Sequence, residues 1–313
     1  MAEINVIKID GKPLEKLIDV ISKGIGTIYR PRAIRKDAEA KAYEIEIIER
    51  AKSKAIAEGK EIDADTYDRI QERLLHKETK RQNNIDNVSQ IAVEQLVQEQ
   101  IVSEDPVDED WTLRFFNIVE DVSDGEMQQL WGRILAGEVK QPKSYSLRTL
   151  ELLRNLSKRE AEVFSRASNF VISSHSSPFL FRGKNDEVLD KHNLTFEDKL
   201  LLTETGILQA DNTITRHLKQ APTEWTIYFE SGRYIIKVLK KANTPENGIE
   251  ILRFTKIGEE LLKLLAPDPL EDYIKDFCLR LEEFGLEVKY AFILTRNVDG
   301  TISHTQPWMK FIN

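Results

Sequence analysis

The stretch SDGEMQQLWGRILAGE, Ser123 to Glu138, has the residue spacing of a helix that buries one face. Its apolar residues recur every three or four positions, as on one side of an α-helix: Met127, Leu130, Trp131, Ile134 and Leu135. Ser123 and Glu126 have the capping-box spacing, so we expect the helix to start at Ser123. The stretch therefore predicts a structural helix, although its Ser, Trp and acidic residues also suit a catalytic site.

The sequence on either side of this stretch predicts more helices of the same kind. DWTLRFFNIVEDV precedes it, and SLRTLELLRNL and SKREAEVF follow it, each with apolar residues at helical intervals. Ser157 with Glu160 forms a second capping box, and Thr195 with Asp198 a shorter-armed variant. Residues 106–172 are therefore predicted to form a central helical block.

The last part of the chain, residues 173–313, mixes strand and helix patterns. EWTIYFESGRYIIKVLKK, residues 224–241, alternates apolar and polar residues on both sides of a Ser-Gly turn, which indicates a β-hairpin. IEILRF predicts another strand, and a last hairpin is expected to turn at Asp299-Gly300. The fold class is therefore α+β and mainly α, and a helix at ITRHLKQ beside the first hairpin would make this module winged-helix-like.

The N-terminal third divides into two predicted segments. Residues 1–32 combine a short strand with an amphipathic helix, and residues 33–105 form an extended helical, coiled-coil-like arm. Its apolar stripe is too narrow for the middle of a globule, so it needs a partner helix from its own chain or another. Self-association through residues 33–105 is the simplest expectation, with an acidic hinge at residues 94–110.

Composition narrows the function classes. The 313 residues carry a formal charge of -8, which argues against a surface that binds nucleic acid or anionic lipid throughout. A single cysteine excludes an internal disulfide and a multi-cysteine zinc site. The N-terminus lacks a secretory-signal pattern, and no apolar run reaches a membrane span, so we expect a cytoplasmic protein.

Candidate binding residues are basic and fall in two places. The N-terminal cluster follows the amphipathic helix, and a membrane-surface contact is an alternative for it; its members are Arg30, Arg32, Arg35 and Lys36. The C-terminal set surrounds the first hairpin, where it would meet a protein partner or nucleic-acid phosphates: Arg216, Lys219, Arg233, Lys237, Lys240 and Lys241.

No sequence motif predicts a cofactor, a metal or catalytic residues. The chain has no phosphate-binding glycine loop and no nucleophile elbow, and its five histidines lie far apart. Cys278 lies on an amphipathic helix, where a buried hydrophobe is expected. Glu287-Val288-Lys289 matches half of a metal-dependent nuclease site, which needs a further carboxylate on a preceding strand.

The block from Asp108 to Phe164, with its LWGRILAGE and SLRTLELLRNLS segments, resembles a bacterial family defined only as a domain of unknown function. The resemblance covers residues 13 to 266. The family is similar in layout to the abortive-infection alpha-type proteins. This resemblance implies a role in defence against phage or mobile elements, with no catalytic residues to carry over.

The resulting prediction is a non-enzymatic, oligomeric sensor, scaffold or effector of bacterial antiviral defence that acts through protein interactions. A companion defence protein is an expected partner. The alternatives are a winged-helix DNA-binding regulator and a metal-dependent nuclease that uses Glu287 and Lys289. If residues 1–105 are an independent arm, their removal leaves a folded monomer.

Overall fold

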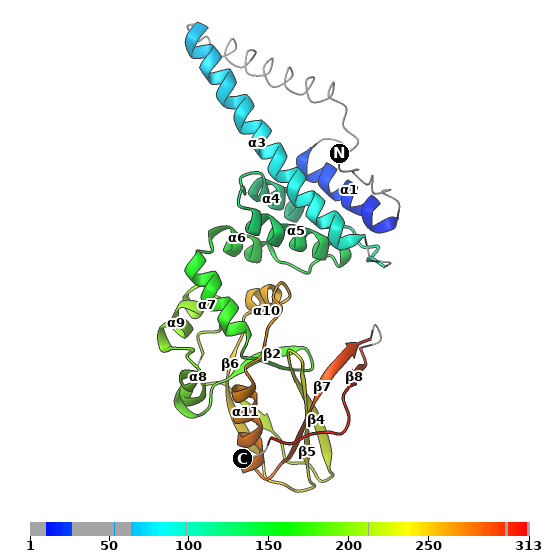
Figure 1. Cartoon of the computed structure of the whole chain (residues 1–313), viewed down its shortest axis with the longest axis vertical. Helices are drawn as coiled ribbons and strands as arrows, with labels where there is room; N and C mark the ends of the chain where they lie inside the picture. The colour runs from blue at the N-terminus through cyan, green and yellow to red at the C-terminus, as the bar shows by residue number, and fades with distance from the viewer. Residues whose placement is uncertain are drawn as a thin grey trace, which may run out of the picture. The chain divides into compact units, whose positions relative to one another are not determined.

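A computed structural model describes residues 11–26, 53, 64–97, 99, 101–211, 213–297 and 300–311, with side chains in 64–68 left aside (Figure 1). The chain divides into two compact units, residues 1–154 and 155–313. The coarse fold class is confirmed as α+β with a helical majority. Within the described ranges, no helix is both long and apolar enough to cross a lipid bilayer.

The first unit is helical. Its helices are α1 (Lys12–Ile25), α3 (Ala64–Leu96), α4 (Glu109–Val119), α5 (Gly125–Lys140) and α6 (Leu147–Asn155), which ends at the border of the unit. Trp131 of α5 is fully buried, with its ring edge-on to Phe115 of α4 at 5.6 Å. Figure 1 shows the C-terminal half of α3 lying across α4 and α5. The core of this unit therefore joins helices far apart in the sequence.

Helix α5 contains most of the stretch from Ser123 to Glu138, and Trp131, Ile134 and Leu135 of its predicted apolar face are buried. Met127 and Leu130, also predicted on this face, are half-buried. The predicted cap is wrong by one residue, because Asp124 accepts a hydrogen bond from the Met127 amide at 2.9 Å. The Ser123 hydroxyl instead lies 3.3 Å from the Asn84 amide nitrogen of α3. Both residue types cap helices well, so sequence spacing alone does not decide between them.

The second unit contains an eight-stranded antiparallel sheet in the order β3-β6-β2-β1-β4-β5-β7-β8. The strands are β1 (Val171–Ser174), β2 (Ser177–Phe181), β3 (Thr215–Leu218), β4 (Trp225–Ser231), β5 (Tyr234–Lys240), β6 (Asn247–Arg253), β7 (Glu287–Arg296) and β8 (Ile302–His304). The helices are α7 (Lys158–Ser168), the 3-10 turn η1 (Lys184–Asp186), α8 (Glu187–Lys191), α9 (Phe196–Glu204), α10 (Lys256–Leu262) and α11 (Glu271–Glu283).

Helix α11 covers one face of this sheet (Figure 1). Phe277 of α11 is fully buried, with its ring 5.3 Å from Phe181 and 5.2 Å from Phe229. One turn earlier, the Tyr273 hydroxyl accepts a hydrogen bond from the Phe181 amide at 2.7 Å and donates one to the Phe181 carbonyl at 3.1 Å. Aromatic packing and a tyrosine hydroxyl bonded to the backbone thus fix the helix on the sheet.

Several local predictions for this unit are confirmed. The hairpin from Trp225 to Lys240 pairs as expected, and the capping boxes at Ser157 and Thr195 form with both hydrogen bonds. The last hairpin reverses between Asn297 and Thr301, with Asp299 outside the described residues. The helix predicted at ITRHLKQ is wrong, because residues 215–218 form strand β3 against β6.

The packing groups the chain differently from the four predicted segments 1–32, 33–105, 106–172 and 173–313. Val88 and Leu96, from the predicted arm, are buried in the same unit as Trp131 of the central block. A cut at residue 105 would expose this shared core, so we expect it to destabilise the remainder of unit 1 and not to leave it folded. The border between the units, at residues 154 and 155, is the better position for dividing the chain.

Candidate functional site

The two ends of helix α3 differ in burial. From Asn84 onward one face packs into unit 1, where Val88 and Ala92 are fully buried. No side chain described between Arg69 and Asn83 is buried, although this part carries apolar residues. Ile70 is 41% exposed, and Leu74 and Leu75 are half-buried. The N-terminal part of α3 is therefore the candidate site for contact with another helix.

The predicted N-terminal basic cluster of Arg30, Arg32, Arg35 and Lys36 lies outside the described residues. The same holds for the predicted strand at residues 3–10 and for the first predicted helix of the arm, apart from Ser53. The membrane-surface alternative for this cluster therefore stays a prediction.

The predicted basic residues of the C-terminal set do not form one surface. Lys240 is fully buried, and its ammonium donates to the carbonyls of Leu218 at 2.5 Å and Pro245 at 2.9 Å. Burial lowers the pKa of Lys240, partly offset by Glu246. Lys240 therefore joins the chain segments around the end of β5 and is inaccessible to a phosphate.

The other members of this set differ in their surroundings. Arg216 on β3 is half-buried, with its guanidinium 5.3 Å from the centre of the Phe179 ring. Arg233, Lys219 and Lys241 are exposed, and the Arg233 guanidinium lies 5.3 Å from the Tyr234 ring. Lys237 is half-buried beside Trp308, an aromatic residue absent from the sequence-based set.

The candidate nuclease residues form a pair with each other. Lys289 donates to Glu287 at 2.7 Å, and this hydrogen bond, followed by the charge of Lys289, lowers the pKa of Glu287. Within the described ranges, no three His, Cys, Asp or Glu residues gather in a way that could hold a metal ion. The part of the chain that the structure describes therefore shows no three-residue metal site at Glu287.

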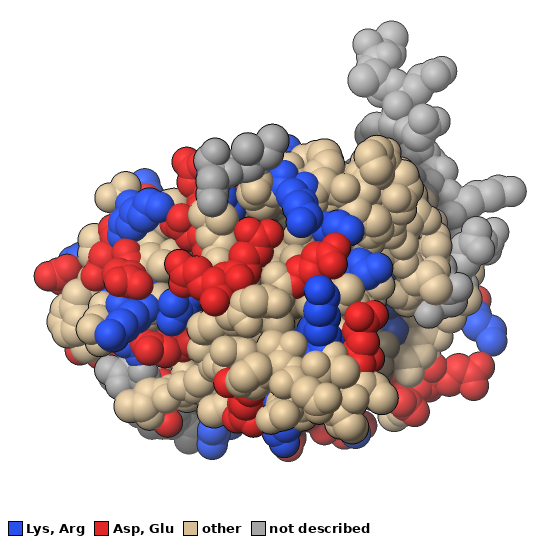
Figure 2. Space-filling model, turned by 90° about the horizontal axis from the view of Figure 1, so that it is seen from below, with Lys and Arg blue, Asp and Glu red and all other residues tan. Residues whose placement is uncertain are grey.

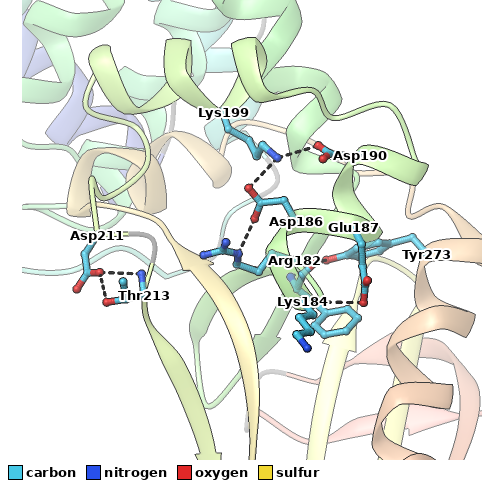
Figure 3. A network of polar contacts seen from close by, with 10 residues as sticks. Arg182, Lys184, Asp186, Glu187, Asp190, Lys199, Asp211, Thr213 and Tyr273 are labelled. Carbon is cyan, nitrogen blue, oxygen red and sulfur yellow. Dashed lines mark hydrogen bonds and ion pairs between the residues drawn. The ribbon is translucent and has the colours of Figure 1, made fainter.

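A buried ion network lies between β2 and α9, but it has the features of a structural element (Figure 3). Lys199 donates to Asp186 at 3.0 Å and to Asp190 at 2.8 Å, and the other Asp186 oxygen lies 2.5 Å from Arg182 Nε. The loop between them needs a left-handed backbone at Gly183, with φ of 69°. The two buried cations already have carboxylate partners, so they hold this loop in place.

The single cysteine gives a direct test of the predicted inert thiol. Cys278 on α11 is 3% exposed, and burial, followed by the charge of Glu282, raises its pKa. Because the thiolate is the reactive form, we expect a thiol reagent to label the native protein at least about 100-fold more slowly than the unfolded chain. Labelling monitored by mass with and without guanidinium measures this, and equal rates would contradict the buried position.

Comparison with known proteins identifies the family. The model of a family described as protein of unknown function (DUF2806) matches residues 68–278, more than half of the chain. This chain belongs to the DUF2806 family. The match runs from the exposed part of α3 to Cys278 on α11, so it covers parts of both units. No curated protein and no solved structure matches the chain.

Proposed function

We propose that this member of the DUF2806 family is a non-enzymatic binding protein that self-associates through the N-terminal part of α3. The observation that carries the proposal is the lack of any buried side chain between Arg69 and Asn83, in a segment with three aliphatic residues. At 33 residues, α3 is about 50 Å long at about 1.5 Å per residue. Helices are stabilised mainly by packing an apolar face, so this part of α3 requires a partner.

A second copy of the chain is the proposed partner. Leu74 and Leu75 lie on the side of α3 that continues the face buried further along by Ile85, Val88 and Leu96. In that later part the face packs on α5 of the same chain, which leaves Ile70, Leu74 and Leu75 as the apolar residues for an intermolecular contact. The alternative partner is segment 33–63 of the same chain, because the sequence predicts a partner helix from either the same chain or another.

Self-association through α3 predicts different effects on assembly for two variants that change the net charge equally. The double substitution Leu74→Glu with Leu75→Glu places two charges in the proposed contact, and we expect it to weaken assembly at least about tenfold. Lys80→Glu, on the opposite side of α3, changes the net charge by the same amount and is expected to leave assembly unchanged. Light scattering of the three full-length proteins over a concentration series measures both. Equal masses for wild type and the Leu74/Leu75 variant would contradict an interface at α3.

The proposed process is bacterial antiviral defence, with a companion defence protein as the further partner. The support is the resemblance in layout to the abortive-infection alpha-type proteins. Expression of the chain with its neighbouring genes should reduce phage plaque formation, and the Leu74/Leu75 variant should lose this protection. Unchanged plaque numbers across a broad phage panel would reject the proposal.

Two other functions compete with this proposal, and each has a distinct readout. A winged-helix DNA regulator would retain duplex DNA in a salt-dependent manner, although the segment expected as its second helix is strand β3. A metal-dependent nuclease would cleave DNA with magnesium and lose that activity on Glu287→Ala. The mixed charge on the face drawn in Figure 2, where basic and acidic side chains alternate, favours protein contacts over an extensive nucleic-acid surface.

A further inference from the structure

One face of the sheet in unit 2 brings together lysines and aromatic rings from distant parts of the chain. Tyr228 on β4 pairs with Lys237 on β5, which pairs with Lys289 on β7, so the three side chains form one row. Trp308 lies beside this row, with its ring 5.9 Å from the Lys237 ammonium and 6.4 Å from the Tyr228 ring. The His304 ring also contacts Trp308, with the two ring centres 4.5 Å apart. We call these five residues the sheet-face patch.

The patch lies on the open side of these strands. Phe229, Ile236 and Val288 point to the buried side, where Phe277 of α11 contacts Phe229. Alternation along a strand therefore places Tyr228, Lys237 and Lys289 on the opposite face. Tyr228 is 46% exposed, and both lysines are half-buried. A ligand can thus reach the ring and the ammonium groups without any movement of α11.

The charge arrangement within the patch is unfavourable without a ligand. Lys237 and Lys289 are directly opposite each other on neighbouring strands, and like charges in this position destabilise a sheet. Glu287 partly neutralises Lys289 at 2.7 Å. Lys237 has no carboxylate partner among the residues that the structure describes. Lys241 and Lys310 add positive charge close enough to affect Glu287.

We propose that the sheet-face patch binds a single strand of nucleic acid. The phosphates would lie between Lys237 and Lys289, where an anion removes the repulsion between the two ammonium groups. Unpaired bases would stack on the rings of Tyr228 and Trp308. Open sheet faces that combine aromatic rings with cations are a common platform for single strands, because every base has a stacking face. This inference does not depend on self-association or on a role in defence.

Single-stranded nucleic acid fits these residues better than an acidic protein or a duplex. An acidic peptide uses the lysines but gives no role to the exposed Tyr228 ring. The bases of a duplex are already stacked on each other, so its contact would be limited to phosphates. Two surface lysines alone would bind phosphate, but the Trp308 ring beside Lys237 and Tyr228 adds a second aromatic surface for a base.

The test is binding of the full-length protein to a labelled oligothymidylate of about 20 nucleotides, measured by fluorescence anisotropy across salt concentrations. Lys237→Gln with Lys289→Gln should weaken binding at least about tenfold and reduce the salt slope by about 1.4, since each phosphate contact contributes about 0.7. Tyr228→Ala should weaken binding about fivefold to 100-fold through loss of stacking. The double lysine variant should melt no lower than wild type, because it also removes the like-charge pair.

Control substitutions outside the sheet-face patch test whether any loss of binding comes only from a lower positive charge or from the loss of an exposed ring. Lys158→Gln with Lys184→Gln removes two exposed lysines elsewhere in unit 2, and Phe196→Ala removes a ring that is 66% exposed on α9. We expect both controls to bind within about twofold of wild type. Equal losses in the controls, unchanged binding in the patch variants, or a duplex bound as tightly as the single strand would each overturn the proposal.

Discussion

Gly132→Leu should unfold the first unit, with a loss of more than about 3 kcal/mol in its free energy of unfolding. A Cβ atom at Gly132 would lie 2.4 Å from Ile91 Cγ2, 2.6 Å from Ile91 Cβ and 3.1 Å from the Val88 carbonyl oxygen. Neither a β-branched side chain nor a helix backbone can move aside locally. The two helices α3 and α5 would therefore have to separate, and Trp131 would lose its buried position.

Urea unfolding followed by far-UV circular dichroism measures this effect in the full-length protein. Gly125→Leu is the matched control, because Gly125 belongs to the same helix and a Cβ there meets nothing within 4 Å. The control should stay within about 0.5 kcal/mol of wild type. An unchanged unfolding midpoint for Gly132→Leu would show that α3 does not pack on α5 at this glycine.

Glu138→Ala should cost the first unit about 3 kcal/mol. The Glu138 carboxylate is 1% exposed and accepts the backbone amides of Lys143 at 2.6 Å and Tyr145 at 3.0 Å. Removal of the carboxylate leaves both amides without this acceptor, one of them in the buried position of Tyr145 and the other in the part-buried turn at Lys143. Glu138 thus holds the turn after α5, where Lys143 has a left-handed φ of 68° and Tyr145 closes over Gly137.

The same unfolding measurement distinguishes this role from a simple loss of charge. Glu138→Gln keeps one acceptor oxygen but replaces the other by an amide donor, so it should lose less stability than Glu138→Ala. Glu126→Ala removes an exposed carboxylate from the first turn of α5 and should cost no more than about 1 kcal/mol. If Glu138→Ala is as stable as Glu126→Ala, the buried carboxylate does not hold the turn.

Together these two positions answer what the stretch from Ser123 to Glu138 does. Its tryptophan fills the core, Gly132 permits the close approach of α3, and Glu138 binds the backbone of the following turn. The prediction of one buried apolar face was sufficient for the helix itself. The roles of the glycine and the carboxylate depend on residues 40 or more positions upstream, or on a later turn, and periodicity carries no information on those contacts.

The sheet shows where local patterns suffice and where they fail. The hairpin from Trp225 to Lys240 has short-range pairing and a marked alternation, so the sequence predicts it well. Strand β3 has four residues and exists through pairing with β6, about 30 residues further along the chain. With four residues, this strand is too short for the two-residue repeat of a strand to be distinguished from the 3.6-residue repeat of a helix.

The candidate sites show the same limit. Strand alternation could have separated Lys237 from Lys240, because Lys240 shares its parity with the buried Tyr234, Ile236 and Val238. The position of Trp308 could not have been predicted, since it depends on the bridge between Tyr290 and Met309. The predicted apolar stripe of the arm has two parts in the structure. From Asn84 onward it is buried in unit 1, and the part described before Asn84 is not buried.

We propose that this chain acts as an assembly of copies joined through α3. The most direct measurement is the mass of the full-length wild-type protein by light scattering over a series of concentrations. Assembly through α3 predicts a mass that is a multiple of 36.2 kDa and that falls toward 36.2 kDa on dilution or in the Leu74→Glu, Leu75→Glu variant. A mass of 36.2 kDa at every concentration would contradict it.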